Sequence, residues 1–240
     1  MEMYSKNLQR DMEVRTFGHG GIPLLAFPTQ DGMAGQWEDF GMTDFLKPWL
    51  ERGDIRLFCV DTVDVESWSL RNGDLEARAR RQEAYFRWIT EELVPRIGQA
   101  PLLTGCSMGG AHSAICLLRR PDLFRGMIGL SGAYDARYFS GGRTSALWLQ
   151  NSAVDILKHP AGSTLRELRT KAIVLCCGQG AHEDIELDAT RLLEKDLRDC
   201  GIPAWVEYWG KEAAHDWLWW KPQLYRFLPI VLNELNKNTL

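Results

Sequence analysis

Several features that mark other protein classes are missing from this sequence. No apolar run approaches the roughly 18 residues that a membrane-spanning helix requires. The first residues have no basic start followed by an apolar stretch, so we expect no secretory signal. There is no internal repeat, and the net charge of −4 leaves no excess of basic residues. A membrane or nucleic-acid partner is therefore not expected.

The six cysteines do not follow the spacing of a zinc site or a disulfide framework. Cys59, Cys176 and Cys177 lie within apolar, strand-like runs, where a thiol behaves as a small hydrophobic side chain. Buried thiols of this kind are usually inert, which argues against a cysteine nucleophile. We expect free core cysteines, a cytoplasmic protein, and neither a metal nor a cofactor.

What the sequence does have is enough apolar material for one core, since 45% of its 240 residues are hydrophobic. Short apolar runs alternate with amphipathic patterns, as is typical of an α/β fold. Strands are expected at residues 12–17, 22–27, 56–60, 102–106, 127–131, 172–177 and 204–209. Helices are expected at residues 37–52, 74–97, 109–118, 185–200 and 216–236. We predict a single domain, residues 1–240, in which helices cover both faces of a mostly parallel sheet. A small loop or helical insert around residues 134–168 is expected to form a lid or pocket wall.

The most informative stretch is Gly105-Cys106-Ser107-Met108-Gly109. It follows one apolar run and opens a predicted helix, and strand, G-x-S-x-G, helix is the pattern of a nucleophile elbow. A serine at such a turn is held in a strained backbone conformation, and the flanking glycines avoid clashes with the neighbouring strand and helix. The sequence therefore predicts Ser107 as the nucleophile of a serine hydrolase or acyl transferase.

A nucleophilic serine needs a base, and in this pattern the base is a histidine on the loop after the last strand. His215 follows the strand expected at 204–209, which places it at the same edge of the sheet as the elbow. Its imidazole can take the Ser107 proton and later give it to the leaving group. The less suitable histidines lie in an early turn, the elbow helix, the insert and the loop where the acid belongs: His19, His112, His159 and His182.

The acid that orients the histidine should follow the strand at 172–177. The loop after that strand offers two adjacent carboxylates, Glu183 and Asp184. Because neighbouring side chains usually point apart, only one of them should reach His215. We favour Asp184 as the acid and keep Glu183 as the alternative, with the other carboxylate capping the helix that follows.

The third component is an oxyanion hole, which needs two preorganised N–H donors. Met108, the residue after the nucleophile, is expected to supply one. The other should come from the loop after the strand at 22–27, which reads Pro28-Thr-Gln-Asp-Gly32. Since Pro28 has no N–H, the sequence leaves Thr29 and Gln30 as candidates.

These motifs together resemble the putative-esterase family of α/β-hydrolases, which includes esterase D, feruloyl esterases and the antigen 85 mycolyltransferases. The resemblance is carried by Gly105-Cys-Ser-Met-Gly-Gly110, by Cys177-Gly-Gln-Gly180 with its acids, and by His215-Asp-Trp217 followed by Trp220. It implies an α/β-hydrolase fold, a triad of Ser107, His215 and Asp184 or Glu183, and ester hydrolysis or acyl transfer without a cofactor. Family members often carry a glycine-rich turn at the first oxyanion loop, whereas this chain has Phe27-Pro-Thr-Gln30.

The leading prediction is a serine carboxylic-ester hydrolase that acts on a small-molecule ester through an acyl-enzyme. Two alternatives stay open: an acyltransferase with an alcohol or sugar acceptor, and a non-catalytic binding module on the same fold. Trp37 and Trp148 are candidate substrate contacts because they lie near the predicted oxyanion loop and insert, and His182 because its loop borders the site. Spacing fits a core role better for Trp205, Trp209, Trp217, Trp219 and Trp220. The oligomeric state is not readable from the sequence.

Overall fold

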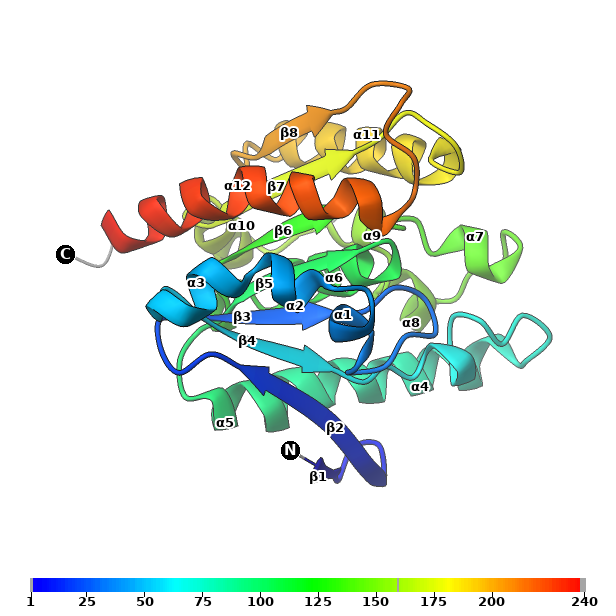
Figure 1. The fold of residues 1–240 in the computed structure, drawn as a ribbon. Coiled ribbons are helices and arrows are strands. Elements are labelled where there is room, and N and C mark those ends of the chain that lie inside the picture. Colours follow the sequence, from blue (N-terminus) through cyan, green and yellow to red (C-terminus); the bar gives the residue numbers. More distant parts are fainter. Residues whose placement is uncertain (1, 159, 238–240) are drawn as a thin grey trace.

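The computed structural model describes residues 2–158 and 160–237. Within them, one mixed sheet forms the centre of the molecule (Figure 1). Its strands are β1 (Glu2–Ser5), β2 (Arg10–Phe17), β3 (Ile22–Phe27), β4 (Ile55–Val60), β5 (Leu102–Cys106), β6 (Gly126–Leu130), β7 (Ala172–Cys177) and β8 (Trp205–Tyr208). They lie in the order β1-β2-β4-β3-β5-β6-β7-β8. The pairs β1–β2 and β2–β4 are antiparallel, and all other pairs are parallel.

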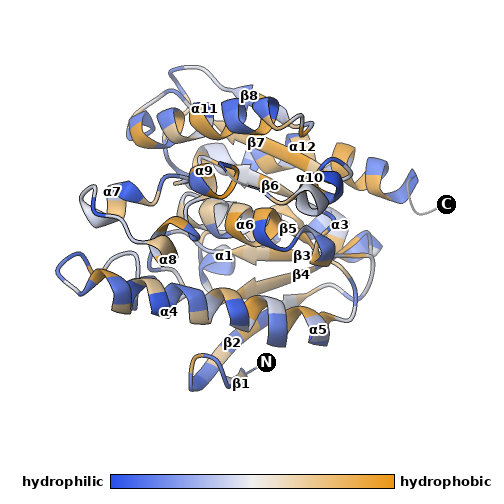
Figure 2. Cartoon of the chain, turned by 180° about the vertical axis from the view of Figure 1, so that it is seen from behind, coloured by the Kyte–Doolittle hydropathy of each residue, from blue (hydrophilic) through white to orange (hydrophobic). Residues whose placement is uncertain are grey.

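Helices cover both faces of this sheet, as Figures 1 and 2 show from opposite sides. One face is covered by α1 (Gln36–Asp39), α2 (Met42–Phe45), α3 (Lys47–Arg52) and α12 (Trp217–Lys237). The other is covered mainly by α4 (Leu75–Arg87), the π-helical η2 (Trp88–Leu93), α5 (Val94–Ile97), α6 (Met108–Arg119) and α11 (Asp184–Asp199). Short 3₁₀ turns are η1 (Asp64–Glu66) and η3 (Pro121–Leu123). The segment between β6 and β7 holds α7 (Arg137–Ser140), α8 (Ala146–Leu149), α9 (Ala153–Ile156) and α10 (Gly162–Leu168).

The central strands are apolar throughout because both of their faces are buried. In β3, Leu25 and Phe27 pack into the core beneath α4 and α6, while Leu24 and Ala26 pack beneath α3 and α12. A strand covered on both sides needs no polar alternation, which explains the continuous run Ile22–Phe27. The predicted α/β architecture, a mostly parallel sheet between two helical layers, is confirmed.

Some elements differ from the sequence-based expectation. The helix expected at 37–52 is three short helices, because Gly41 adopts a left-handed conformation with φ 68° and turns the chain between α1 and α2. The helix expected at 74–97 is helical along its length but passes through the π-helical η2. In its described residues the insert at 134–168 contains four short helices, and the unused histidine candidate within it, His159, lies outside the described residues.

The parallel strands all end at one edge of the sheet, so the loops after β3, β5, β7 and β8 gather there (Figure 1). That edge holds the serine, histidine and acidic residues singled out in the sequence. Among the described helices, none combines the length and the apolar character needed to cross a bilayer.

Candidate active site

Ser107 lies at the turn between β5 and α6, in a backbone conformation that a serine rarely adopts. Its φ is 57° and its ψ −122°, and its N–H donates to the Leu130 carbonyl at 2.9 Å. Holding a residue with a side chain in this region costs about 1–3 kcal/mol. The turn requires glycine at position 109, because a Cβ there would lie only 2.5 Å from the Phe27 carbonyl oxygen. The geometry is that of the expected nucleophile elbow.

His215 lies on the loop between β8 and α12, and main-chain hydrogen bonds hold that loop against the loop after β7. The N–H of His215 donates to the Ala181 carbonyl at 3.0 Å, and the N–H of Gly180 donates to the Ala213 carbonyl at 2.8 Å. A Cβ at Gly178 would lie 2.1 Å from the same Ala213 carbonyl oxygen. The glycines of the Cys177-Gly-Gln-Gly180 stretch are therefore required for the two loops to approach each other.

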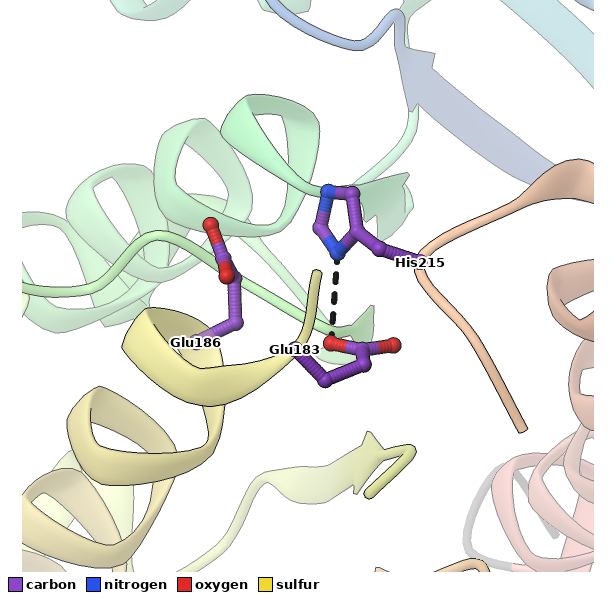
Figure 3. A group of neighbouring side chains, drawn as sticks. All are labelled: Glu183, Glu186 and His215. Carbon is purple, nitrogen blue, oxygen red and sulfur yellow. Dashed lines mark hydrogen bonds and ion pairs between the residues drawn. The ribbon is translucent and has the colours of Figure 1, made fainter. Parts of the chain in front are cut away.

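The acid that meets His215 is Glu183. Its Oε2 lies 3.2 Å from His215 Nδ1, and its side chain is only 1% exposed (Figure 3). The other oxygen, Oε1, accepts a hydrogen bond from the Ser131 hydroxyl at 2.6 Å. Ser131 Oγ in turn accepts one from the Trp220 indole N–H at 3.2 Å. A buried carboxylate is stable only when its oxygens are paired in this way.

The preference for Asp184 over Glu183 was wrong in its geometry. Asp184 is exposed and opens helix α11, whereas Glu183 is the residue just before the helix and points inward. The two adjacent side chains do point apart, as expected, but with their predicted places exchanged. The helix begins one residue earlier than predicted, and that shift decides which carboxylate faces the histidine.

A second carboxylate, that of Glu186, lies beside the same imidazole (Figure 3). One ligand atom from each of Glu183, Glu186 and His215 lies within 4.8 Å of the others, so these three side chains could also hold a metal ion. In this structure Glu183 is engaged by His215 and Ser131 instead. Burial is the main influence on Glu186 and raises the pKa of its carboxyl, although the nearby His215 acts in the opposite direction.

The two N–H groups expected to form the oxyanion hole have different surroundings. The Thr29 N–H donates to Gln36 Oε1 at 2.7 Å and is thus already occupied. Among the described residues, no acceptor bonds the N–H of Gln30. Met108 is the first residue of α6, so its N–H has no acceptor within the helix. Of the two candidates after β3, the structure leaves Gln30 available and Thr29 not.

Ser107 and His215 open onto one shared cavity of about 350 Å³. Its lining residues are Thr29, Gln30, Ser107, His215, Asp216, Trp217 and Trp220. No hydrogen bond joins Ser107 to His215 among the described contacts; catalytic hydrogen bonds are often long in the absence of substrate. Hollows of about 620 and 630 Å³ lie elsewhere on the surface, but neither contains these two residues.

The expected substrate contacts are not where the sequence placed them. Trp37 and Trp148 are at most 1% exposed, and their indole N–H groups donate to the carbonyls of Phe27 and Ala136. Both are core residues. His182 is exposed, with φ 64°, and lies outside the cavity.

Trp217 and Trp220, which spacing assigned to the core, are buried there, and each also contributes to the cavity wall, a role that the sequence analysis missed. The missed signal was their position directly after His215, at the start of the helix that borders the site. The insert at 134–168, which was expected to form a lid or pocket wall, contributes no lining residue to this cavity.

Comparison with known proteins agrees with the fold. The model of a family described as Putative esterase matches residues 5–230. A ferulic acid esterase has a similar structure, with a TM-score of 0.75, 17% identity, and coverage of 97% of this chain and 96% of that one. An S-formylglutathione hydrolase from Agrobacterium tumefaciens has a TM-score of 0.75 and 15% identity, with coverage of 97% of this chain and 93% of that one. MPT51 of Mycobacterium tuberculosis has a TM-score of 0.74 and 13% identity, with coverage of 97% of both chains. These likenesses show an α/β-hydrolase fold. No curated protein sequence matches the chain.

Proposed function

Because the chain belongs to the Putative esterase family of α/β-hydrolases, we propose that it is a serine carboxylic-ester hydrolase with Ser107, His215 and Glu183 as its triad. The observation that carries the proposal is the shared cavity. Ser107, His215 and Gln30 all border it, and a buried carboxylate holds the far nitrogen of the histidine. Nucleophile, base and a free N–H donor thus border one space large enough for a small ester, and the acid lies buried behind the base.

The proposed reaction begins when Ser107 Oγ attacks the ester carbonyl carbon and His215 Nε2 takes the Oγ proton. The negative charge that develops on the carbonyl oxygen is stabilised by the N–H groups of Met108 and Gln30. His215 then gives its proton to the departing alkoxide, which leaves as the alcohol. The acyl group stays attached to Ser107 as an ester.

In the second half of the reaction, His215 removes a proton from water as the water attacks the acyl carbon. The tetrahedral intermediate collapses, the carboxylic acid leaves, and the proton on His215 returns to Ser107. Throughout, Glu183 remains a carboxylate that keeps the His215 Nδ1–H in place and stabilises the imidazolium. Ser131 and Trp220 hold Glu183 for this role.

The size of the cavity supports a preference for short acyl groups. At about 350 Å³ it is near the small end of ligand pockets, and two indole rings form part of its wall. We expect p-nitrophenyl acetate or butyrate to be hydrolysed with a higher kcat/KM than the laurate ester. Faster turnover on addition of alcohols would instead favour acyl transfer.

The nucleophile is tested by comparing Ser107→Ala with Ser113→Ala, which removes a buried hydroxyl from the same helix. Ser113 bonds the Gly109 carbonyl and does not line the cavity. We expect Ser107→Ala to lose at least about a thousandfold in kcat and all labelling by a fluorophosphonate, since removing a triad member costs orders of magnitude. A loss of less than about tenfold with the protein still folded would contradict the assignment. Absent labelling of the folded native protein would favour a non-catalytic module.

A further inference from the structure

A line of buried polar side chains lies behind the loop that carries Gln30, outside the proposed triad. Its members are Asp64 on η1, Trp68 just after it, Gln82 on α4 and His112 on α6. None is more than 1% exposed. Three separate elements therefore contribute polar groups to one buried position, where each group needs a hydrogen-bond partner.

The direction of each hydrogen bond in this line can be assigned. The Trp68 indole can only donate, and its N–H lies 2.9 Å from Gln82 Oε1, which fixes the orientation of the amide. Gln82 Nε2 then faces His112 Nδ1 at 3.4 Å and donates to it. The ring proton of His112 is consequently on Nε2, which donates to Asp64 Oδ1 at 3.0 Å.

The remaining oxygen of Asp64 holds the proposed oxyanion loop. Asp64 Oδ2 accepts the main-chain N–H of Asp31 at 3.2 Å. Asp31 has the left-handed φ of 60° and directly follows Gln30, so the peptide plane of its N–H fixes where the Gln30 backbone lies. Other bonds anchor the loop further along, from Thr62 Oγ1 to the Gly32 carbonyl and from the Ala34 N–H to Asp61. Nearer Gln30, its own side-chain amide donates to Ser69 Oγ, which donates to Asp31 Oδ1. The bond to Asp64 is the one that links the main chain beside Gln30 to helix α6 through His112.

The middle of the line, at His112, lies on the helix that begins at Met108. His112 lies four residues after Met108 on α6, and residues at this spacing are neighbours on one side of a helix. Aromatic rings surround the imidazole: its centroid lies 5.7 Å from that of Phe27 and 5.1 Å from that of Tyr85. The ring is thus immobilised by packing as well as by hydrogen bonds.

We propose that Asp64 and His112 are positioning residues that set the distance between the two halves of the oxyanion hole. The Asp64 carboxylate joins the loop of Gln30 to the helix of Met108, and the two N–H donors belong to those two elements. A buried charged or polar network adds little net stability compared with apolar packing, so its value here is geometric. This inference rests on the proposed function, since it concerns the oxyanion hole of that reaction.

The first test is Asp64→Asn, which keeps the shape of the side chain but removes one acceptor. Removing a whole oxyanion donor costs about 100- to 1000-fold in kcat, so displacing one should cost about 10- to 100-fold, with KM changed by less than about threefold. The matched control is Thr90→Val. It deletes a buried hydroxyl of η2 that donates to the Phe86 carbonyl and takes no part in the line of Asp64 and His112. It should lower Tm and leave kcat unchanged.

A second pair of variants keeps the test decisive if Asp64→Asn fails to fold. In His112→Gln the amide N–H can replace the Nε2 donor, whereas His112→Leu leaves Asp64 without that partner. We expect His112→Gln to retain kcat within about threefold and His112→Leu to lose at least about tenfold. An alkyl boronic acid, which mimics the tetrahedral intermediate, should lose affinity in parallel with kcat/KM, while the product acid should bind as before.

Equal kcat in the native protein, Asp64→Asn and His112→Leu would overturn the positioning role. So would a parallel loss of product-acid affinity, because it would indicate general damage to the cavity. Ser107→Ala, measured in the same assay, separates this failure from failure of the proposed function. If Ser107→Ala is active, the serine mechanism is wrong; if it is inactive while Asp64→Asn is normal, only the positioning role is wrong.

Discussion

Glu183 and Asp184 show that a shift of one residue in the start of a helix changes which side chain points into the protein. Both are carboxylates, both precede or open α11, and only their direction differs. Helix boundaries read from sequence are uncertain by one or two residues, which is enough to exchange an inward and an outward side chain. The chain order of serine, acidic loop and histidine was readable, whereas the identity of the acid was not.

At this position we expect Glu183→Gln to lower kcat by about a thousandfold or more, because an amide cannot stabilise the imidazolium as a carboxylate does. The matched change Asp184→Asn, on the exposed neighbour, should alter kcat by less than about threefold. Steady-state hydrolysis of p-nitrophenyl butyrate measures both. A larger effect from Asp184→Asn than from Glu183→Gln would contradict the assignment.

The second carboxylate at the site, Glu186, should make stability depend on pH. Burial raises its pKa in the folded state, so folding favours the protonated form. The stabilisation is fully present below the pKa of the unfolded chain and is lost as the pH rises through the folded-state pKa. Glu186→Gln removes this dependence, so its Tm relative to the native protein should be higher at pH 7 than at pH 4.

Thermal unfolding at the two pH values tests this. Asp188→Asn provides the control, because that side chain is 83% exposed on the same helix. Its Tm difference from the native protein should vary less with pH. A Glu186→Gln difference that falls as the pH rises would mean that an attraction to His215 outweighs burial.

At the scale of elements, strand positions were readable from the sequence and helix interruptions were not. Residues 22–27, 102–106 and 172–177 form strands as predicted, because mainly apolar runs of five or six residues are long enough for a strand and too short for a buried helix. The spacing of apolar residues predicted one helix at 37–52 and did not reveal that Gly41, in a left-handed conformation, interrupts it. Which of Thr29 and Gln30 has a free N–H for the oxyanion hole depends on the Gln36 side chain, which accepts the Thr29 N–H. The sequence around Gln36 does not predict where that side chain points.

The elbow gives a sharp prediction at this scale. A Cβ on Gly109 would lie 2.5 Å and 2.6 Å from the carbonyl oxygens of Phe27 and Pro28, which cannot move without displacing the end of β3. Gly109→Ala should therefore lower both Tm and kcat. Gly162→Ala is the control, since the nearest atom to its Cβ is a side-chain nitrogen of Arg166 at 3.8 Å and alanine is the better helix former.

Differential scanning fluorimetry and the ester assay would be applied to both glycine variants. We expect the Gly162→Ala protein to match or exceed the native Tm at normal kcat. Normal kcat in Gly109→Ala would show that the turn tolerates a side chain, contrary to the close approach of α6 and β3.

At the scale of the whole molecule, the sequence predicted the architecture because alternation of strands and helices reports burial on both faces of a sheet. It did not predict the additional edge strand β1, whose four residues are too few to give a pattern. Nor did it predict the cavity, because its wall combines loops from opposite ends of the chain. Trp217 and Trp220 were correctly assigned to the interior, yet each also borders the cavity.

Compact packing should also govern thiol reactivity. All six cysteines are free, and only Cys200 is partly exposed. Burial raises the pKa of Cys116 to about 12, which suppresses its thiolate at neutral pH. Ellman's reagent should therefore modify at most one thiol in the native protein and all six after unfolding. Cys200→Ser should abolish the native reaction, and rapid modification of several thiols would contradict the packed core.

Trp220 joins two properties that an evolving or engineered enzyme would otherwise adjust separately. Its ring forms part of the cavity wall, while its N–H bonds the serine that holds Glu183. Replacing it with a smaller residue to admit bulkier esters would also loosen the acid behind His215. Widening the cavity at Trp220 should therefore lower turnover, and variants selected for new esters should change Trp217 first, because among the described contacts its indole bonds and stacks on no side chain of the triad.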